Sequence, residues 1–243
     1  MSTIPFDGAT RLAVMTGAGV SAESGVSTFR ESGGLWEKYN VYEVATPEAF
    51  ARDPRLVWEF YNLRRKQLTT VEPNAAHVAL ARLDAAMPDG QFTLITQNVD
   101  DLHDRASSRG SHNIIHMHGE LAKVRCTGCG AITTTLDELG RLPHCDDCGA
   151  MLRPHIVWFG EVPMHMDRIQ RAVSDCTLFL VVGTSGTVYP AAGMLSLAKA
   201  RGACTVGVNL DAPENVADLD HFHQGKAGEL LPPLVEDWLS RLG

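Results

Sequence analysis

The chain has 243 residues, of which 44% are hydrophobic and 21% are charged, and this balance is typical of a globular protein with a buried core. It excludes disordered, collagen-like and low-complexity chains. The 21 Lys and Arg residues against 29 Asp and Glu residues give a formal net charge of -8. Because this charge repels phosphates, we expect no nucleic-acid partner.

The start of the chain lacks the charged region, apolar stretch and cleavage site of a signal peptide. The longest apolar run, around residues 178–182, is far shorter than the roughly 20 residues that cross a bilayer. We therefore expect a cytoplasmic protein with no membrane partner. In a reducing compartment, paired cysteines favour a metal site over disulfides.

Short runs rich in Val, Ile and Leu predict buried strands, and longer helical patterns lie between them. The expected strands are residues 12–15, 92–95, 178–182 and 205–208, and clear helices are expected at 75–86 and 166–173. This alternation indicates an α/β fold with a parallel sheet and crossover helices. Two segments break it, a helical one at about 35–70 and a cysteine-bearing one at about 121–153.

The first strand leads into a G-x-G-x-x-A pattern that begins at Gly17. Small residues there allow backbone N–H groups to approach a pyrophosphate, although a tight turn without a ligand would also need them. A usual dinucleotide-binding fold holds the ribose with an acidic residue at the end of the next strand, but Glu37 has no strand before it. Instead, Phe29 and Arg30 in the continuing loop could cover a nucleotide.

Polar side chains follow the strand at 92–95, where the carboxyl ends of parallel strands bind ligands. Gln97, Asn98 and Asp100 can present amide and carboxylate groups there, but an N-cap cluster explains Asn98 and Asp100 equally well. Further along, strand alternation would place His116 and His118 on one face.

The cysteine pattern is C-x2-C, fifteen intervening residues, then C-x2-C, which is the spacing of a four-thiolate zinc ribbon. A glycine follows each pair, as a tight turn toward one ion requires. Redox pairs or disulfides are the alternatives. Four protein ligands would close the site, so the metal would be structural. The expected ligands are Cys126, Cys129, Cys145 and Cys148.

Six features together resemble the sirtuins, which are NAD-dependent protein lysine deacylases, and they follow that family's order over nearly the whole chain. They are Gly17-Ala18-Gly19-Val20-Ser21 continuing to Phe29-Arg30, the tetrad Gln97-Asn98-Val99-Asp100, His118-Gly119-Glu120, the cysteine pairs, Trp158-Phe159-Gly160-Glu161 and Gly183-Thr184-Ser185.

The resemblance implies a Rossmann-like large domain and a small domain made of a helical insertion and a zinc ribbon. On that basis residues 1–34, 71–120 and 154–243 form the NAD-binding domain, 35–70 the helical insertion and 121–153 the zinc ribbon. It also implies which residues surround NAD, a cosubstrate that is consumed. They are Gly17, Ala18, Gly19, Ser21, Glu23, Phe29, Arg30, Trp36, Gln97, Asn98, Val99, Asp100, Gly183, Thr184, Ser185, Asn209, Leu210, Asp211 and Ala227.

In the mechanism that the resemblance implies, the acyl oxygen of an acylated lysine attacks the ribose carbon that bears nicotinamide, and nicotinamide leaves. His118 would be the general base and Asn98 the second catalytic residue, and an ordinary histidine pKa of about 6.5 suits this task. The products are free lysine, nicotinamide and O-acyl-ADP-ribose. The substrate peptide adds as a strand beside residues 159–161, with Val157 and Phe159 lining the acyl-lysine tunnel.

Asp53-Pro54 predicts a helix start, and Tyr61 and Arg64 share a face of that helix. This Tyr-x-x-Arg pair resembles the sirtuin branch that removes succinyl and malonyl groups, whose carboxylates a phenol and a guanidinium can bind. From position alone, Arg64 would be an exposed arginine of an amphipathic helix. We expect that exposed position for its neighbours Arg65 and Lys66.

We therefore expect a monomeric deacylase of acylated lysine-containing proteins, with desuccinylase, demalonylase and deacetylase activity. One alternative is a mono-ADP-ribosyltransferase that uses the same NAD site. Another is a non-catalytic NAD-sensing module that binds acylated proteins, although His118 and Asn98 argue against it.

Overall fold

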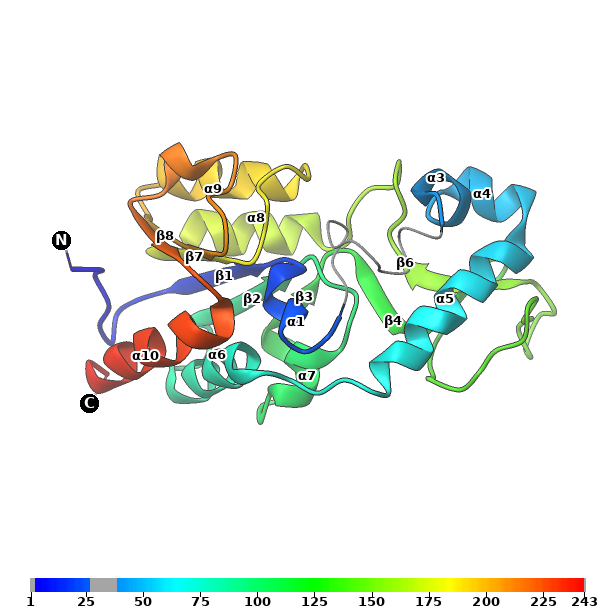
Figure 1. Ribbon diagram of the computed structural model, residues 1–243, viewed down its shortest axis with the longest axis horizontal. Helices are drawn as coiled ribbons and strands as arrows, with labels where there is room; N and C mark the ends of the chain where they lie inside the picture. Colours follow the sequence, from blue (N-terminus) through cyan, green and yellow to red (C-terminus); the bar gives the residue numbers. More distant parts are fainter. Residues whose placement is uncertain (1–2, 27–38, 243) are drawn as a thin grey trace.

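The computed structural model describes residues 3–26 and 39–242, and six parallel strands form its largest sheet. These strands are β1 (Leu12–Thr16), β2 (Phe92–Thr96), β3 (Ile114–His116), β7 (Leu178–Val182), β8 (Cys204–Asn209) and β9 (His221–Gln224). Their order across the sheet is β3-β2-β1-β7-β8-β9 (Figure 1). The predicted α/β class is confirmed, and each of the four predicted strands is found within one residue of its expected ends.

Helices cover both faces of this sheet, with α6 (Ala75–Ala86) and α10 (Ala227–Ser240) on one face and α8 (Met166–Asp175) and α9 (Ala191–Ala200) on the other (Figure 1). In β1, Leu12 and Val14 pack into the first core, whereas Ala13 and Met15 pack into the second. Burial on both faces is why the strands are almost continuously apolar. The shorter elements are α1 (Gly19–Ala22), α7 (Leu102–Ala106) and the 3-10 turns η1 (Ser111–Asn113) and η2 (Val216–Asp218).

A smaller unit lies at the end of the molecule away from the two termini (Figure 1). It contains the helices α3 (Val41–Val44), α4 (Pro47–Arg52) and α5 (Pro54–Leu68), and an antiparallel sheet in the order β5-β4-β6, with β4 (Gly119–Cys126), β5 (Ile132–Thr134) and β6 (Leu152–Ile156). The helix start at Asp53 is confirmed, because the Asp53 carboxylate accepts the Leu56 N–H at 3.1 Å and Pro54 is the first helical residue.

The division into domains at residues 34, 70, 120 and 153 stays a prediction. Strands β4 and β6 run across two of these boundaries, since they begin at Gly119 and end at Ile156. A third core joins the two insertions, and in it Phe60 and Tyr61 of α5 pack with Leu121 and Ile156 of the antiparallel sheet. Within the described part of the chain, every helix is too short or too polar to span a bilayer.

The expectation that Arg65 is exposed is wrong. Its side chain is 2% exposed and donates hydrogen bonds to the carbonyls of Leu121 at 2.9 Å, Thr135 at 2.6 Å and Asp137 at 3.0 Å. These carbonyls belong to β4 and to the loop after β5, where backbone acceptors lack strand partners and need donors. Arg65 therefore ties α5 to the cysteine-bearing segment, whereas Lys66 is exposed as expected.

Candidate functional site

The loops after β1 and β7 lie against each other without room for a side chain. Gly17 and Gly19 donate backbone hydrogen bonds to the carbonyls of Val182 and Gly183, at 3.0 and 2.9 Å. A Cβ atom on Gly17 would lie 2.8 Å from the Gly183 oxygen, and one on Gly19 would lie 2.8 Å from the Gly183 Cα. Gly183 itself has a φ of +61°, which favours glycine. Contact between the two loops thus accounts for all three glycines.

The same two loops present backbone donors that the protein does not use. Among the described residues, the N–H groups of Ala18, Thr184 and Ser185 have no hydrogen-bond acceptor. Backbone N–H groups at the carboxyl edge of a parallel sheet are the donors that bind phosphates in α/β folds. The edge therefore fits an anionic ligand such as a pyrophosphate.

Side chains from the neighbouring strands extend this edge. The Gln97 amide after β2 donates to the Thr184 hydroxyl at 3.1 Å, and the Asn209 amide at the end of β8 donates to the Thr184 carbonyl at 2.9 Å. Leu210 and Asp211 follow β8 and are exposed. The structure thus brings together predicted residues that are more than 100 positions apart in the sequence.

Asn98 and Asp100 are buried at 7% and 5% exposure. Asn98 donates to the Ser21 hydroxyl at 3.1 Å, and Asp100 accepts the Leu102 N–H at 3.2 Å. Asp100 therefore takes a hydrogen bond from the first residue of α7, although the N-cap position of that helix is Asp101. Burial raises the pKa of Asp100, because the charged carboxylate is poorly solvated there. Next to it, the Val99 carbonyl accepts the Leu121 N–H at 2.8 Å.

Ser21 also contacts His77, and the neighbours of His77 determine which of its ring nitrogens carries the proton. His77 Nδ1 accepts the Asn74 backbone N–H at 3.2 Å, and its Nε2 lies 3.4 Å from the Ser21 hydroxyl. The ring therefore carries its proton on Nε2 and can donate to Ser21. Burial lowers the pKa of His77 to about 4, so the ring is neutral at physiological pH.

His118 lies in the turn between β3 and β4, beside Gln97. Its Nδ1 is 3.0 Å from the Gln97 carbonyl, which can only accept, so Nδ1 carries the proton and Nε2 keeps a free lone pair. Burial lowers the pKa of His118, although the hydrogen bond to Gln97 partly offsets this. The imidazole is therefore neutral at physiological pH, which is the state that a general base needs.

His116 does not share this environment, because β3 ends at His116 and a turn follows. The expected strand alternation therefore stops before His118. His116 Nε2 lies 2.9 Å from the Asp104 carboxylate. Burial acts to lower the pKa of His116, but the hydrogen bond and charge of Asp104 outweigh it and the pKa is raised.

The segment after β6 connects the large sheet to the small unit. Val157 donates to the His118 carbonyl at 2.9 Å, and Phe159, which is 49% exposed, donates to the Ala45 carbonyl at 3.0 Å. Glu161 holds the segment from its far end, with two hydrogen bonds from the Arg153 guanidinium at 2.7 and 2.8 Å. Arg153 was not predicted from the sequence, in which nothing marks it as buried. In the structure it is only 9% exposed, and a buried guanidinium needs an acidic partner such as Glu161.

Tyr61 and Arg64 lie on one face of α5, as predicted. The Tyr61 hydroxyl accepts the Trp158 Nε1–H at 2.9 Å, and the Arg64 Cζ lies 5.9 Å from the Tyr61 ring centroid. Burial lowers the pKa of Arg64, and the negative charge of the Asp100 carboxylate acts in the opposite direction. The Arg64 side chain is half-buried and lies beside Tyr61.

Of the remaining predicted NAD residues, Glu23 and Ala227 belong to two segments that a hydrogen bond joins. The Glu23 carboxylate accepts the Gly228 N–H at 2.7 Å, which joins the first loop to the start of α10 beside the buried Ala227. Three further predictions, Phe29, Arg30 and Trp36, lie outside the described residues.

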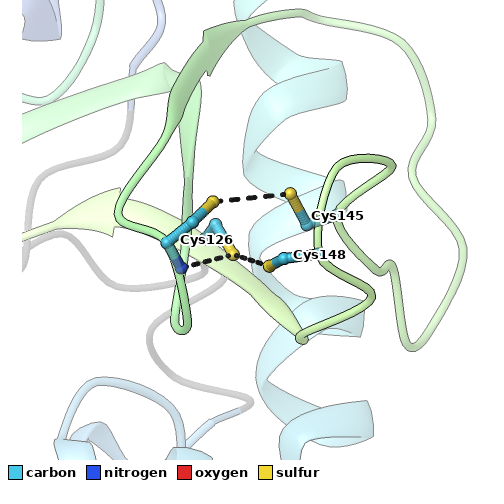
Figure 2. A group of neighbouring side chains, drawn as sticks. Cys126, Cys145 and Cys148 are labelled. Carbon is cyan, nitrogen blue, oxygen red and sulfur yellow. Dashed lines mark hydrogen bonds between the residues drawn. The ribbon is translucent and has the colours of Figure 1, made fainter.

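The four predicted cysteines converge in the small unit, and all four sulfurs lie within 4.8 Å of one another. Figure 2 shows Cys126, Cys145 and Cys148 of this group with their side chains pointing toward one another. Cys126 and Cys148 are 3.3 Å apart, and Cys129 and Cys145 are 3.8 Å apart. Tetrahedral Zn–S bonds of about 2.3 Å place two sulfurs about 3.8 Å apart, so the donor set fits zinc. Hydrogen bonds from the backbone N–H groups of Cys129 and Gly128 lower the pKa of Cys126, whereas the neighbouring sulfurs raise the pKa of Cys129.

Comparison with known proteins identifies the family. The Sir2 family model matches residues 17–190. A Pasteurella multocida protein named NAD-dependent protein deacylase is 52% identical over 233 residues, which cover 94% of this chain and 98% of that protein. One of the same name from Salmonella typhimurium is 50% identical over 238 residues, covering 96% and 85%. The crystal structure of a Sir2 homolog–NAD complex superimposes with a TM-score of 0.88 at 42% identity, covering 97% of this chain and 92% of the other. The chain belongs to the Sir2 family.

Proposed function

We propose that this protein is an NAD-dependent protein lysine deacylase that removes succinyl and malonyl groups as well as acetyl groups. The names of its Sir2 relatives support the deacylase activity. The single observation that carries the proposal is the state of His118, a neutral imidazole with a free Nε2 at the carboxyl edge of the sheet. A module that only senses NAD would not need such a base.

NAD is proposed to bind along the edge formed by the loops after β1, β2, β7 and β8. The unpaired N–H groups of Ala18, Thr184 and Ser185 support a pyrophosphate position there. The proposed contacts are Gly17, Ala18, Gly19, Ser21, Glu23, Phe29, Arg30, Trp36, Gln97, Asn98, Val99, Asp100, Gly183, Thr184, Ser185, Asn209, Leu210, Asp211 and Ala227.

In the proposed reaction, NAD supplies the ribose carbon that accepts the acyl oxygen as nicotinamide leaves. His118 removes a proton from a ribose hydroxyl through Nε2, while the Gln97 carbonyl holds Nδ1 and so keeps the ring in the tautomer that can accept. Asn98, held by Ser21, orders the nicotinamide end. The ribose oxygen freed in this way attacks the acyl carbon of the imidate, and one water molecule completes the release of the lysine amine. The proposed products are nicotinamide, free lysine and O-acyl-ADP-ribose, so one NAD and one water are consumed for each acyl group removed.

The acylated peptide is proposed to add as a strand beside residues 159–161, with Val157 and Phe159 lining the acyl-lysine tunnel. Tyr61 and Arg64 then bind the carboxylate of a succinyl or malonyl group. Their proximity on α5 supports this role, because a phenol and a guanidinium together provide charge-assisted hydrogen bonds. The four cysteines hold one structural Zn²⁺, since four protein ligands leave no open position for catalysis.

The test is to incubate the protein with NAD and matched acetyl- and succinyl-lysine peptides, and to detect O-acyl-ADP-ribose by mass spectrometry. Arg64→Met should lower kcat/KM for the succinyl peptide at least about 10-fold more than for the acetyl peptide, because one charge-assisted contact is lost. Equal losses would contradict the assignment of Tyr61 and Arg64 to acidic acyl groups.

Two other outcomes would overturn the deacylase proposal as a whole. Transfer of labelled ADP-ribose to protein, with no O-acyl-ADP-ribose from either peptide, would indicate a mono-ADP-ribosyltransferase. Binding of NAD and acylated peptide without any turnover would indicate a sensing module.

A further inference from the structure

A buried indole stands between the proposed peptide segment and the proposed acyl-selecting pair. Trp158 is 3% exposed, and its Nε1–H donates to the Tyr61 hydroxyl at 2.9 Å. An indole N–H can only donate, so the phenol oxygen accepts in this contact and uses one of its lone pairs. The Tyr61 hydroxyl can therefore still bind another group by donating its proton or by accepting through its second lone pair.

The hydrogen bond from Trp158 does not use the proton of the Tyr61 hydroxyl. Tyr61 is 1% exposed, and no acceptor for that proton exists among residues 3–26 and 39–242. Buried polar hydrogens in folded proteins nearly always have a partner, so this one indicates a partner that arrives with a ligand. Burial raises the pKa of Tyr61, and the hydroxyl therefore keeps its proton at physiological pH.

Arg153 and Glu161 hold the indole in place. The Arg153 Cζ lies 3.6 Å from the Trp158 ring centroid, and its guanidinium also donates to the Ile156 carbonyl at 2.8 Å. Glu161 accepts two hydrogen bonds from Arg153 and one from the Trp158 backbone N–H at 2.8 Å. A cation over the ring face draws electron density from the indole and makes its N–H a stronger donor.

We infer that Trp158 is a specificity-determining residue for acidic acyl groups, because its indole N–H occupies the acceptor side of Tyr61 and so commits the Tyr61 proton to a ligand carboxylate beside Arg64. This inference rests on the proposed function and deepens it. An acetyl group carries no carboxylate, so this orientation matters for succinyl- and malonyl-lysine and not for acetyl-lysine.

The test is Trp158→Phe, which keeps an aromatic ring and removes the N–H. The ratio of kcat/KM for succinyl-lysine to that for acetyl-lysine should fall about 10-fold, the effect of one lost hydrogen bond. Trp58→Phe is the matched control, since Trp58 is also fully buried but donates its Nε1–H to the Leu152 carbonyl at 3.0 Å. The control should leave the ratio unchanged.

Two further variants separate hydrogen bonding from packing. Placing 3-benzothienylalanine at position 158 replaces the N–H by sulfur with little change of shape, and it should reproduce the fall even if Trp158→Phe does not fold. In a Tyr61→Phe background there is no hydroxyl to orient, so Trp158→Phe should cause no further fall in the ratio.

An unchanged ratio in either folded Trp158 variant would overturn the inference, as would a further fall in the Tyr61→Phe background. These results leave the proposed function intact, because the unaltered protein still turns over both peptides. Failure of the unaltered protein to release O-succinyl-ADP-ribose would instead overturn the proposed acyl preference, and the inference with it.

Discussion

The loops at the carboxyl edge of the parallel sheet and the small antiparallel unit are built from different kinds of contact. At the sheet edge, backbone packs on backbone, since Gly17 and Gly19 lie too close to Gly183 for any side chain. In the small unit, side chains reach distant carbonyls, as Arg65 and Trp58 do. Backbone donors suit the proposed NAD ligand, which is always the same, whereas side chains suit the proposed selection among acyl groups, which one substitution could change.

The largest effect is expected for His118→Ala, which tests the sheet edge without changing the small unit. Loss of a general base should lower kcat/KM about 100- to 10,000-fold for acetyl- and succinyl-lysine alike. NAD should still bind, because the loops after β1 and β7 do not depend on the imidazole. Single-turnover kinetics and NAD titration by calorimetry measure the two effects. If His118→Ala lowered kcat/KM for one acyl group much more than for the other, the sheet edge would contribute to acyl selectivity as well, which would contradict the comparison of the two regions.

A second effect should be confined to the small unit. Cys148→Ser removes one of four proposed zinc ligands, and zinc content measured by mass spectrometry should fall from one per chain to nearly none. Loss of several kcal/mol of metal binding should lower Tm by about 10 °C, since each kcal/mol is worth about 2–4 °C in a chain of this size. Cys204→Ser is the control, because Cys204 lies in β8 away from the cluster. Equal zinc content in both variants would refute the zinc proposal.

The smallest effect concerns two neighbouring positions on α5. Arg65→Met leaves three carbonyl contacts unmade and should lower the free energy of unfolding by roughly 3 kcal/mol. Lys66→Met, at an exposed position, should change it by less than about 0.5 kcal/mol. Denaturant unfolding measures both. Similar stabilities for the two variants would mean that Arg65 does not hold the two insertions together.

The parts of the fold that the sequence predicts well are those whose signal is local. The strand at 178–182 is buried on both faces and therefore reads as one apolar run. Helix α6 begins where Asn74 accepts the Ala76 N–H, and α5 begins where Asp53 and Pro54 form a cap. The cysteine pairs likewise carry their geometry in their spacing.

The parts that could not be predicted depend on distant partners. Arg65 bonds carbonyls 56 to 72 positions away, and nothing in the sequence around it distinguishes it from the exposed Lys66. The edge strand at 221–224 is half-exposed and polar, so it lacks the apolar run of the central strands. The bond between Trp158 and Tyr61 joins residues 97 positions apart, which periodicity cannot reveal.

Two hydrogen bonds hold His118, one at its ring and one at its main-chain carbonyl. The imidazole is tied to the Gln97 carbonyl after β2, while its own carbonyl receives the Val157 N–H from the segment after β6. Any shift of that segment on binding of the proposed peptide strand would therefore also move the proposed general base. In the proposed reaction, peptide binding and proton removal are coupled through this one residue, so tight-binding peptides of different sequence should differ in maximal velocity as well as in half-saturation.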